Sequence, residues 1–237
     1  MKLCILENDD LDSAVAPIYG GYGAMVQRLF GDAGAGDWQF DIFHTPSGHY
    51  PEAFDGYDAV LLTGSKADAF SQEEWVVELR RRVASLLTQK KKLLGICFGH
   101  QLIALCLGAR VGRAPQGWGV GRMAYDWNGV NTASNSARPT LALLASHQDQ
   151  VFELPPNARL LASNAHCPVA AYALDEHVFC VQGHPEFVVD YSAFLLNKRR
   201  DQLGEALYTQ GIESLAKGHD GLAVARWMLA FVNGQAI

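Results

Sequence analysis

One stretch, Leu93-Leu94-Gly95-Ile96-Cys97-Phe98-Gly99-His100-Gln101, constrains the fold more than any other part of the chain. It begins as a short apolar run typical of a buried strand and continues into a helical pattern at residues 102–107. A strand that turns sharply into a helix crowds its own backbone, so glycine is favoured beside the turn. The pattern Gly-x-Cys-x-Gly therefore indicates a nucleophile elbow, in which the helix N-terminus favours the thiolate of Cys97. A buried structural cysteine would fit the same five residues, and the pentapeptide alone leaves both interpretations open.

Short apolar runs and helical patterns alternate along the first hundred residues. This order predicts an α/β fold with a parallel or mixed central sheet and helices on both faces. In such a sheet, functional groups gather at the carboxyl ends of the strands. Thr63-Gly64-Ser65 and Cys97 both fall there. The expected strands are 2–6, 38–43, 58–62 and the run before Cys97, and the expected helices are 24–30 and 72–87.

The second half of the chain has a different pattern. Residues 108–135 are rich in glycine, aromatic residues and short β-like pieces such as 122–127, which predicts a small antiparallel excursion from the main sheet. Residues 128–136 have the composition of a polar turn. Because no linker or internal repeat is present, we expect a single domain over residues 1–237. Further strands are expected at 141–145, 160–163, 169–173 and 177–182, followed by a helical C-terminal segment at about 190–237.

Composition and charge exclude several classes of protein. Charged residues are 19% of the 237 residues and the net charge is -6, whereas a nucleic-acid partner would demand a basic face. No apolar run reaches the length of about 18 residues that a membrane-spanning helix needs. The apolar run at 2–6 is too short, and its flank too acidic, for a signal peptide. We therefore expect a cytoplasmic protein with neither a nucleic-acid nor a membrane partner.

The five cysteines are scattered along the chain and include no Cys-x-x-Cys pair. This pattern indicates neither a zinc site nor a disulfide framework. Cys4, Cys106 and Cys180 lie in apolar segments, as small core residues do. No metal or other cofactor is expected.

A cysteine nucleophile needs a base, and the base needs an orienting group. Among eight histidines, His184 stands out because it follows a strand at the same sheet edge as the elbow. It lies in Gly183-His184-Pro185-Glu186, where Pro185 stiffens the backbone between the imidazole and the carboxylate of Glu186. A carboxylate on one imidazole nitrogen fixes the tautomer and leaves the other nitrogen for the thiol. Alone this segment would suit an ordinary turn, but its combination with the elbow favours catalysis.

Three motifs occur in one order along the chain: residues 95–101, Ser146-His147-Gln148-Asp149 and Gly183-His184-Pro185-Glu186. Together they resemble the class I glutamine amidotransferases, in the branch typified by the amidotransferase domain of GMP synthetase. This resemblance extends from Lys2 to about Glu186 and implies a flavodoxin-like, three-layer fold. Thr63-Gly64-Ser65 with the later Asp-Ala-Phe at 68–70 is similar to the stand-alone plant γ-glutamyl peptidases, which cleave γ-glutamyl bonds in glutathione conjugates.

The resemblance implies a role for each matching residue. Cys97 would be the nucleophile, His184 the general acid and base, and Glu186 the group that orients His184. The oxyanion hole is implied to use the backbone N–H of Phe98 and that of Ser65 or Gly64. The residues implied to hold the α-amino and α-carboxylate ends of a glutamyl group are Gln101, Ser146 and His147.

One segment departs from the synthetase pattern. That pattern has two adjacent glycines before a proline, whereas this chain has Gly64-Ser65-Lys66. A backbone donor survives replacement of glycine by serine unless the position needs a positive φ. The departure therefore weakens the assignment as a classical amidotransferase more than it weakens catalysis.

Three hypotheses follow for the function. The first is a stand-alone hydrolase that cleaves the γ-glutamyl amide bond of glutamine or γ-glutamyl peptides through a γ-glutamyl thioester. The second is a glutaminase subunit that delivers ammonia to a separate synthase, which would then be a required partner. The third is a catalytically silent binding or regulatory module on the same fold. The intact Cys97, His184 and Glu186 argue against the third.

Overall fold

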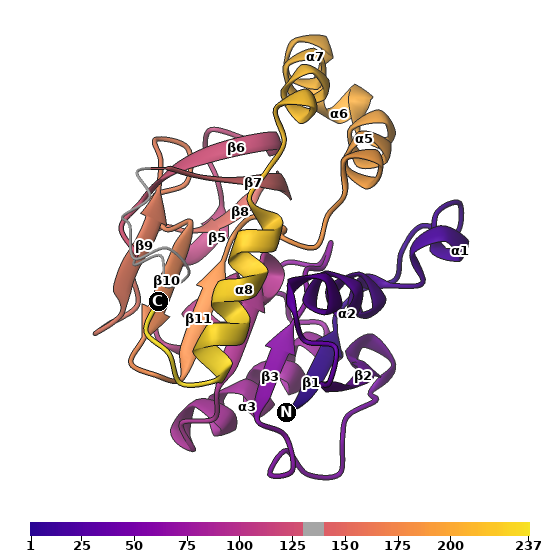
Figure 1. The fold of residues 1–237 in the computed structure, drawn as a ribbon. Helices are drawn as coiled ribbons and strands as arrows, with labels where there is room; N and C mark the ends of the chain where they lie inside the picture. The colour runs from indigo at the N-terminus through magenta and orange to yellow at the C-terminus, as the bar shows by residue number, and fades with distance from the viewer. Residues whose placement is uncertain (130–139) are drawn as a thin grey trace.

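A mixed β-sheet forms the centre of the computed structural model, which describes residues 1–129 and 140–237 (Figure 1). The first five strands across the sheet pair in parallel, and the others pair antiparallel. This confirms the prediction of a parallel or mixed sheet. In spatial order the strands are β2 (Gln39–His44), β1 (Lys2–Glu7), β3 (Ala59–Leu62), β4 (Leu93–Ile96), β11 (Val178–Val181), β10 (Ala171–Leu174), β9 (Arg159–Ser163), β6 (Gly119–Trp127) and β7 (Thr140–His147).

Helices cover both faces of the parallel part of the sheet, as predicted. One face is covered by α2 (Tyr22–Ala33) and α8 (Gly221–Val232), and the other by α3 (Glu74–Thr88) and α4 (Phe98–Cys106). In β1, Leu3 and Ile5 pack on the side of α2 and α8, whereas Cys4 and Leu6 pack on the side of α3 and α4. This alternation is the two-residue period of a strand that is buried on both faces. Figure 1 shows α8 lying beside α2 across the front of the sheet.

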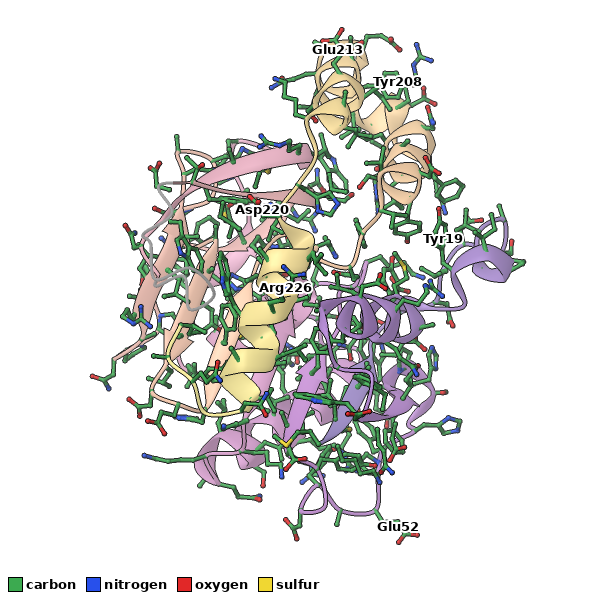
Figure 2. All side chains as sticks on the ribbon, in the orientation of Figure 1. Tyr19, Glu52, Tyr208, Glu213, Asp220 and Arg226 are labelled. Carbon is green, nitrogen blue, oxygen red and sulfur yellow. The ribbon has the colours of Figure 1, made fainter. Side chains whose placement is uncertain are left out.

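The C-terminal segment is helical, as predicted, and its helices occupy two places. The helices of the first group are α5 (Val189–Lys198), α6 (Arg200–Leu203) and α7 (Glu205–Ser214), followed by the short η2 (Leu215–Lys217). They project beyond the sheet before α8 returns across it, and Figure 2 labels Tyr208 and Glu213 in this projecting part. The base of α5 is joined to the start of α2, because Tyr191 Oη lies 2.9 Å from Tyr22 Oη.

The antiparallel excursion expected at residues 108–135 is divided between two sheets. A small antiparallel pair consists of β5 (Val111–Arg113) and β8 (Asp149–Val151). The longer β6 belongs to the main sheet instead, where it pairs with both β7 and β9. Most of the polar turn expected at 128–136 lies outside the described residues.

One helix near the edge of the sheet is longer than the sequence predicts, and two short helical turns are additional. The helix expected at 24–30 is longer and spans Tyr22–Ala33. Gly23 lets it approach β2 closely, since a Cβ at Gly23 would lie 2.7 Å from Ile42 Cγ2. Short helical turns also occur at α1 (Ala16–Tyr19) and η1 (Thr45–Ser47). None of the helices that the described residues form is long and apolar enough to cross a membrane.

Candidate active site

Cys97 occupies the turn between β4 and α4. Its backbone has φ 52° and ψ −103°, a conformation that few residues other than glycine adopt. The turn is held because Cys97 N–H donates to the Val181 carbonyl at 2.9 Å. The flanking glycines are required by space, since a Cβ at Gly99 would lie 2.4 Å from the Leu62 carbonyl oxygen and one at Gly95 would lie 2.8 Å from the His100 nitrogen. The sequence thus folds locally into the turn that its glycines predict.

His184 and Glu186 form a buried pair next to this turn. His184 Nδ1 lies 2.7 Å from Glu186 Oε1, and both residues are 4% exposed. The His184 backbone is fixed to β7 by an N–H bond to the Leu144 carbonyl at 2.8 Å. Its ring stacks on Phe187, with the ring centroids 3.8 Å apart. These contacts leave the imidazole little freedom to turn.

The charge of His184 depends on three influences. Burial acts to lower its pKa, but the charges of Glu186 and of Cys97 outweigh burial and raise the pKa to about 10. Cys97 and Glu186 therefore both act on the imidazole, and Glu186 does so through the 2.7 Å contact with Nδ1. An imidazole with this pKa carries a proton at neutral pH.

Backbone N–H groups also lie close to Cys97. Phe98 is the first residue of α4, so its N–H has no acceptor within the helix. Gly64 is packed directly on the pair, because a Cβ there would lie 2.7 Å from His184 Cε1 and 3.7 Å from Cys97 Cβ. The next residue, Ser65, accepts a bond from the Ala67 N–H through its hydroxyl at 3.1 Å. Gly64 and Phe98, from two separate segments, therefore lie beside Cys97.

A cavity of about 410 Å³ opens onto this group of residues. Phe187, Tyr22 and Tyr191 line part of it and place an aromatic wall beside the imidazole. Gly64, Phe98 and Glu186 do not line the cavity. The predicted site residues that do line it are Ser65, Cys97, Gln101, Ser146, His147 and His184.

The three residues predicted to hold the glutamyl group already make contacts within the protein. Gln101 Nε2 donates to the Asp149 carbonyl at 2.8 Å and to Gln182 Oε1 at 3.1 Å, which leaves its Oε1 as the amide atom able to accept from a ligand. Ser146 Oγ accepts a bond from Arg199 at 2.8 Å. His147 is buried beside the Asp149 carbonyl. Burial, followed by the charge of a neighbouring histidine, lowers its pKa to about 3, so it is neutral at pH 7.

Two arginines that the sequence did not predict as site residues, Arg113 and Arg199, also line the cavity. Arg113, at the end of β5, binds two carboxylates, with Nε 2.7 Å from Asp149 Oδ1 in β8 and Nη2 2.9 Å from Asp68 Oδ1 in the loop after β3. Arg199 lies over the ring of Trp118, 5.2 Å from its centroid. Neither arginine belongs to a motif, so no local signal in the sequence could have found it. Across residues 1–129 and 140–237, no group of three or more His, Cys, Asp or Glu side chains is placed to hold a metal ion.

Comparison with protein families matches residues 37–196 to the family described as glutamine amidotransferase class-I. The chain belongs to this family. Gamma-glutamyl peptidase 3 of Arabidopsis thaliana is 38% identical over 181 residues, which cover 73% of this chain and 72% of that protein. A GMP synthase [glutamine-hydrolyzing] of Aeropyrum pernix is 32% identical over 183 residues, covering 73% of this chain but 35% of that protein.

Solved structures show the same fold. A glutamine amidotransferase from Thermotoga maritima has a TM-score of 0.76 at 20% identity, and the similarity covers 98% of both chains. The matched family region, 37–196, contains both Cys97 and His184. In this class-I amidotransferase, the elements outside that region are β1, α1 and α2 at one end, and the last two residues of α5 with α6, α7, η2 and α8 at the other.

Proposed function

We propose that this class-I amidotransferase is a stand-alone hydrolase that cleaves the γ-glutamyl amide bond of glutamine or γ-glutamyl peptides. The observation that best supports this proposal is the position of Cys97 on a strained turn, beside a His184 whose Nδ1 is held by Glu186 at 2.7 Å. A nucleophile, a base and an orienting carboxylate are the parts that nucleophilic catalysis requires. The likeness to gamma-glutamyl peptidase 3 favours this substrate class.

In the proposed first half-reaction, the thiolate of Cys97 attacks the γ-carbonyl carbon and forms a C–S bond. The carbonyl π electrons move onto oxygen, and the resulting oxyanion accepts bonds from Phe98 N–H and from Gly64 or Ser65 N–H. Protonated His184 then gives its proton to the leaving nitrogen. The C–N bond breaks, the amine departs and a γ-glutamyl thioester remains on Cys97.

In the second half-reaction, water replaces the amine. Neutral His184 takes a proton from the attacking water, whose oxygen bonds to the γ-carbon. The C–S bond breaks, glutamate leaves, and the thiolate–imidazolium pair is restored. Glu186 keeps the imidazole oriented through both steps and stabilises its cation. Gln101, Ser146 and His147 are proposed to hold the α-amino and α-carboxylate groups of the glutamyl unit.

A direct assay tests the proposal. The purified chain, without any added protein, is incubated with glutamine and with glutathione, and glutamate release is measured. Cys97→Ser serves as the control for background hydrolysis. We expect partner-free release of glutamate that the control lacks. Absence of release from every γ-glutamyl compound in a substrate panel would contradict the proposal.

A second function is favoured by one comparison. The GMP synthase of Aeropyrum pernix matches this chain over only 35% of its own length, so the rest of that protein has no counterpart in the matched residues. If the chain delivers ammonia, a separate synthase must receive it. In that case glutamate release should be near background for the purified chain and should rise when the synthase binds. The free thiols of all five cysteines support a reducing, cytoplasmic setting for either function.

A further inference from the structure

The loop that follows β3 is held by residues at the end of β1. Asn8 N–H donates to Thr63 Oγ1 at 3.0 Å, and Asn8 Nδ2 donates to the Thr63 carbonyl at 3.0 Å. The orientation of the Asn8 amide is itself fixed, because Thr45 Oγ1 donates to Asn8 Oδ1 at 2.8 Å. Asn8, Thr45 and Thr63 are all completely buried. A polar network of this kind, with its partners satisfied, is rigid.

Three more hydrogen bonds hold the loop farther along the chain. The hydroxyl of Thr63 donates to the Gly64 carbonyl at 3.1 Å. The backbone N–H of Lys66 donates to Asp9 Oδ2 at 2.8 Å, and the ammonium of Lys66 lies 2.8 Å from Asp9 Oδ1. Three consecutive peptide groups, from Thr63 to Lys66, are therefore each held through one of their polar atoms.

This arrangement decides where the free donors point. In a trans peptide the N–H is directed opposite to the C=O, and the described chain has no cis peptide bond. Because the Thr63 and Gly64 carbonyls are turned toward Asn8 and the Thr63 hydroxyl, the N–H groups of Gly64 and Ser65 are directed away from them. Gly64 at the same time packs against Cys97 and His184. Neither peptide can rotate without breaking a buried hydrogen bond.

We propose that Asn8, Asp9 and Thr63 are positioning residues that hold the oxyanion donors of the Gly64–Ser65 segment in place before substrate arrives. The inference rests on the proposed function, because it assigns an oxyanion to that site. Donors stabilise a transition state most when they need no reorganisation during the reaction. A loop fixed by the chain's own side chains needs no partner protein to order it, so this inference also favours the stand-alone hydrolase.

Substitution at Thr63 tests the inference. Thr63→Val keeps the shape of the side chain but removes the hydroxyl, whereas Thr63→Ser keeps the hydroxyl. We expect kcat for glutamate release to fall about 10- to 100-fold in Thr63→Val, less than the about 100- to 1,000-fold loss caused by deleting an oxyanion donor. KM should stay within about threefold, because the ground state does not use the oxyanion hole. Thr63→Ser should restore most of kcat.

Two controls separate positioning from general damage. Thr88→Val removes a hydroxyl that bonds a helix carbonyl on the exposed end of α3, and it should leave kcat unchanged. Alkylation of Cys97 by iodoacetamide forms no oxyanion, so its rate should be the same in wild type and Thr63→Val. Equal loss of alkylation and turnover would indicate a collapsed site and overturn the inference. A wild-type kcat in Thr63→Val would also overturn the inference.

Asp9 provides a second test should Thr63→Val fail to fold. Asp9→Ala removes the acceptor of the Lys66 N–H, whereas Asp9→Asn keeps an oxygen that can accept it. We expect kcat to fall in Asp9→Ala and to recover in Asp9→Asn, with little change in KM. Equal kcat values in the two variants and in wild type would overturn the inference while leaving the proposed function intact. Failure of wild type to release glutamate from any γ-glutamyl compound would instead refute the proposed function.

Discussion

At the scale of single residues, the proposed nucleophile Cys97 has a strained backbone conformation. Its φ of 52° places a non-glycine side chain in the left-handed region, where conformations persist only if surrounding contacts enforce them. Here the enforcing contacts are the bond to the Val181 carbonyl and the close packing of Gly95 and Gly99. The same turn places Cys97 beside His184 and directly before Phe98, the first residue of α4. Strain at this residue therefore coincides with the atoms proposed to react.

Substitution of the three proposed catalytic residues should give graded effects. Cys97→Ser should abolish turnover, because a serine hydroxyl beside this imidazole is a far weaker nucleophile. His184→Ala should be nearly as severe, since the leaving amine would depart without a proton. Glu186→Gln should be milder, because the carboxylate orients the imidazole and stabilises its cation. Initial glutamate release at saturating substrate measures each effect.

The same three residues should act as one unit. A double variant that lacks both Cys97 and His184 should be hardly worse than either single variant. Thermal transitions that match wild type would show that the fold survives. Wild-type activity in Cys97→Ser would refute the mechanism, whereas full activity in Glu186→Gln would reduce it to a Cys97–His184 pair.

The pH dependence of catalysis should reflect His184. Burial acts to lower its pKa, but the charges of Glu186 and Cys97 raise the pKa to about 10. Since the pKa is raised, the imidazolium is present at neutral pH and is lost as the pH rises through about 10. We expect kcat/KM to decline in that range, and to decline at lower pH in Glu186→Gln. A pH–rate profile of both proteins tests this; a wild-type decline centred on the ordinary histidine value of 6.5 would contradict it.

Thiol reactivity should single out Cys97 among the cysteines. Burial raises the pKa of Cys4, Cys167 and Cys180 to about 12 and that of Cys106 to about 11, so these four thiols stay protonated at neutral pH. Cys97 instead lines the cavity beside a protonated imidazole. Brief treatment with iodoacetamide at neutral pH should therefore modify Cys97 first, as read by mass spectrometry of digested peptides. Faster modification of any other cysteine would count against Cys97 as the nucleophile.

At the scale of elements, α4 depends on its close approach to β3. A Cβ at Gly99 would lie 2.4 Å from the Leu62 carbonyl oxygen and 2.6 Å from Leu62 Cβ. Gly99→Ala should push α4 away from the strand and lower the free energy of unfolding by about 1–3 kcal/mol. Gly31→Ala in α2 is the matched control: no atom lies within 4 Å of the added Cβ, and stability should rise by about 0.5–1 kcal/mol. Urea unfolding measures both, and equal stability of Gly99→Ala and wild type would contradict the close packing.

The elements that could be predicted are those with a strong period. Buried strands such as β1 and β3 are short apolar runs, and α3 carries Leu79 and Val83 at the spacing of a helix. The strands β5 and β8 contain three residues each, too few for any period to appear. The membership of β6 in the main sheet depends on pairing with β7 and β9, which lie later in the chain. Local patterns carry no information on such pairing.

The same distinction applies to the candidate site. Cys97 and His184 could be located because each comes soon after a strand and stands in a recognisable motif. Contacts between residues far apart in the sequence could not be located in this way. Asn8 and Thr63 are 55 positions apart, and Arg199 and Ser146 are 53 positions apart. Such contacts exist only once the sheet has aligned its strands. Residues that support a site are therefore harder to predict than residues that react.

At the scale of the whole molecule, α8 connects distant parts of the chain. At its start, Asp220, labelled in Figure 2, exchanges backbone and side-chain bonds with Ala142 of β7 at 2.7 and 2.9 Å. At its end, the ammonium of Lys92 donates to the Val232 carbonyl at 2.7 Å, which satisfies the C-terminus of the helix. Between them, Trp227 stacks on Trp127 of β6 with ring centroids 4.4 Å apart. The last helix thus fixes both halves of the sheet to each other.

Removal of one of these contacts should affect the stability of the whole chain. Trp227 is 1% exposed, so Trp227→Ala leaves a large cavity against Trp127 and should lower the free energy of unfolding by about 3–5 kcal/mol. Arg226, the preceding residue, is exposed on the same helix and labelled in Figure 2. Arg226→Ala should change stability by less than about 0.5 kcal/mol, because it removes no buried contact. Urea unfolding followed by circular dichroism compares the two variants with wild type. Similar midpoints for all three proteins would show that the sheet holds together without the packing of α8.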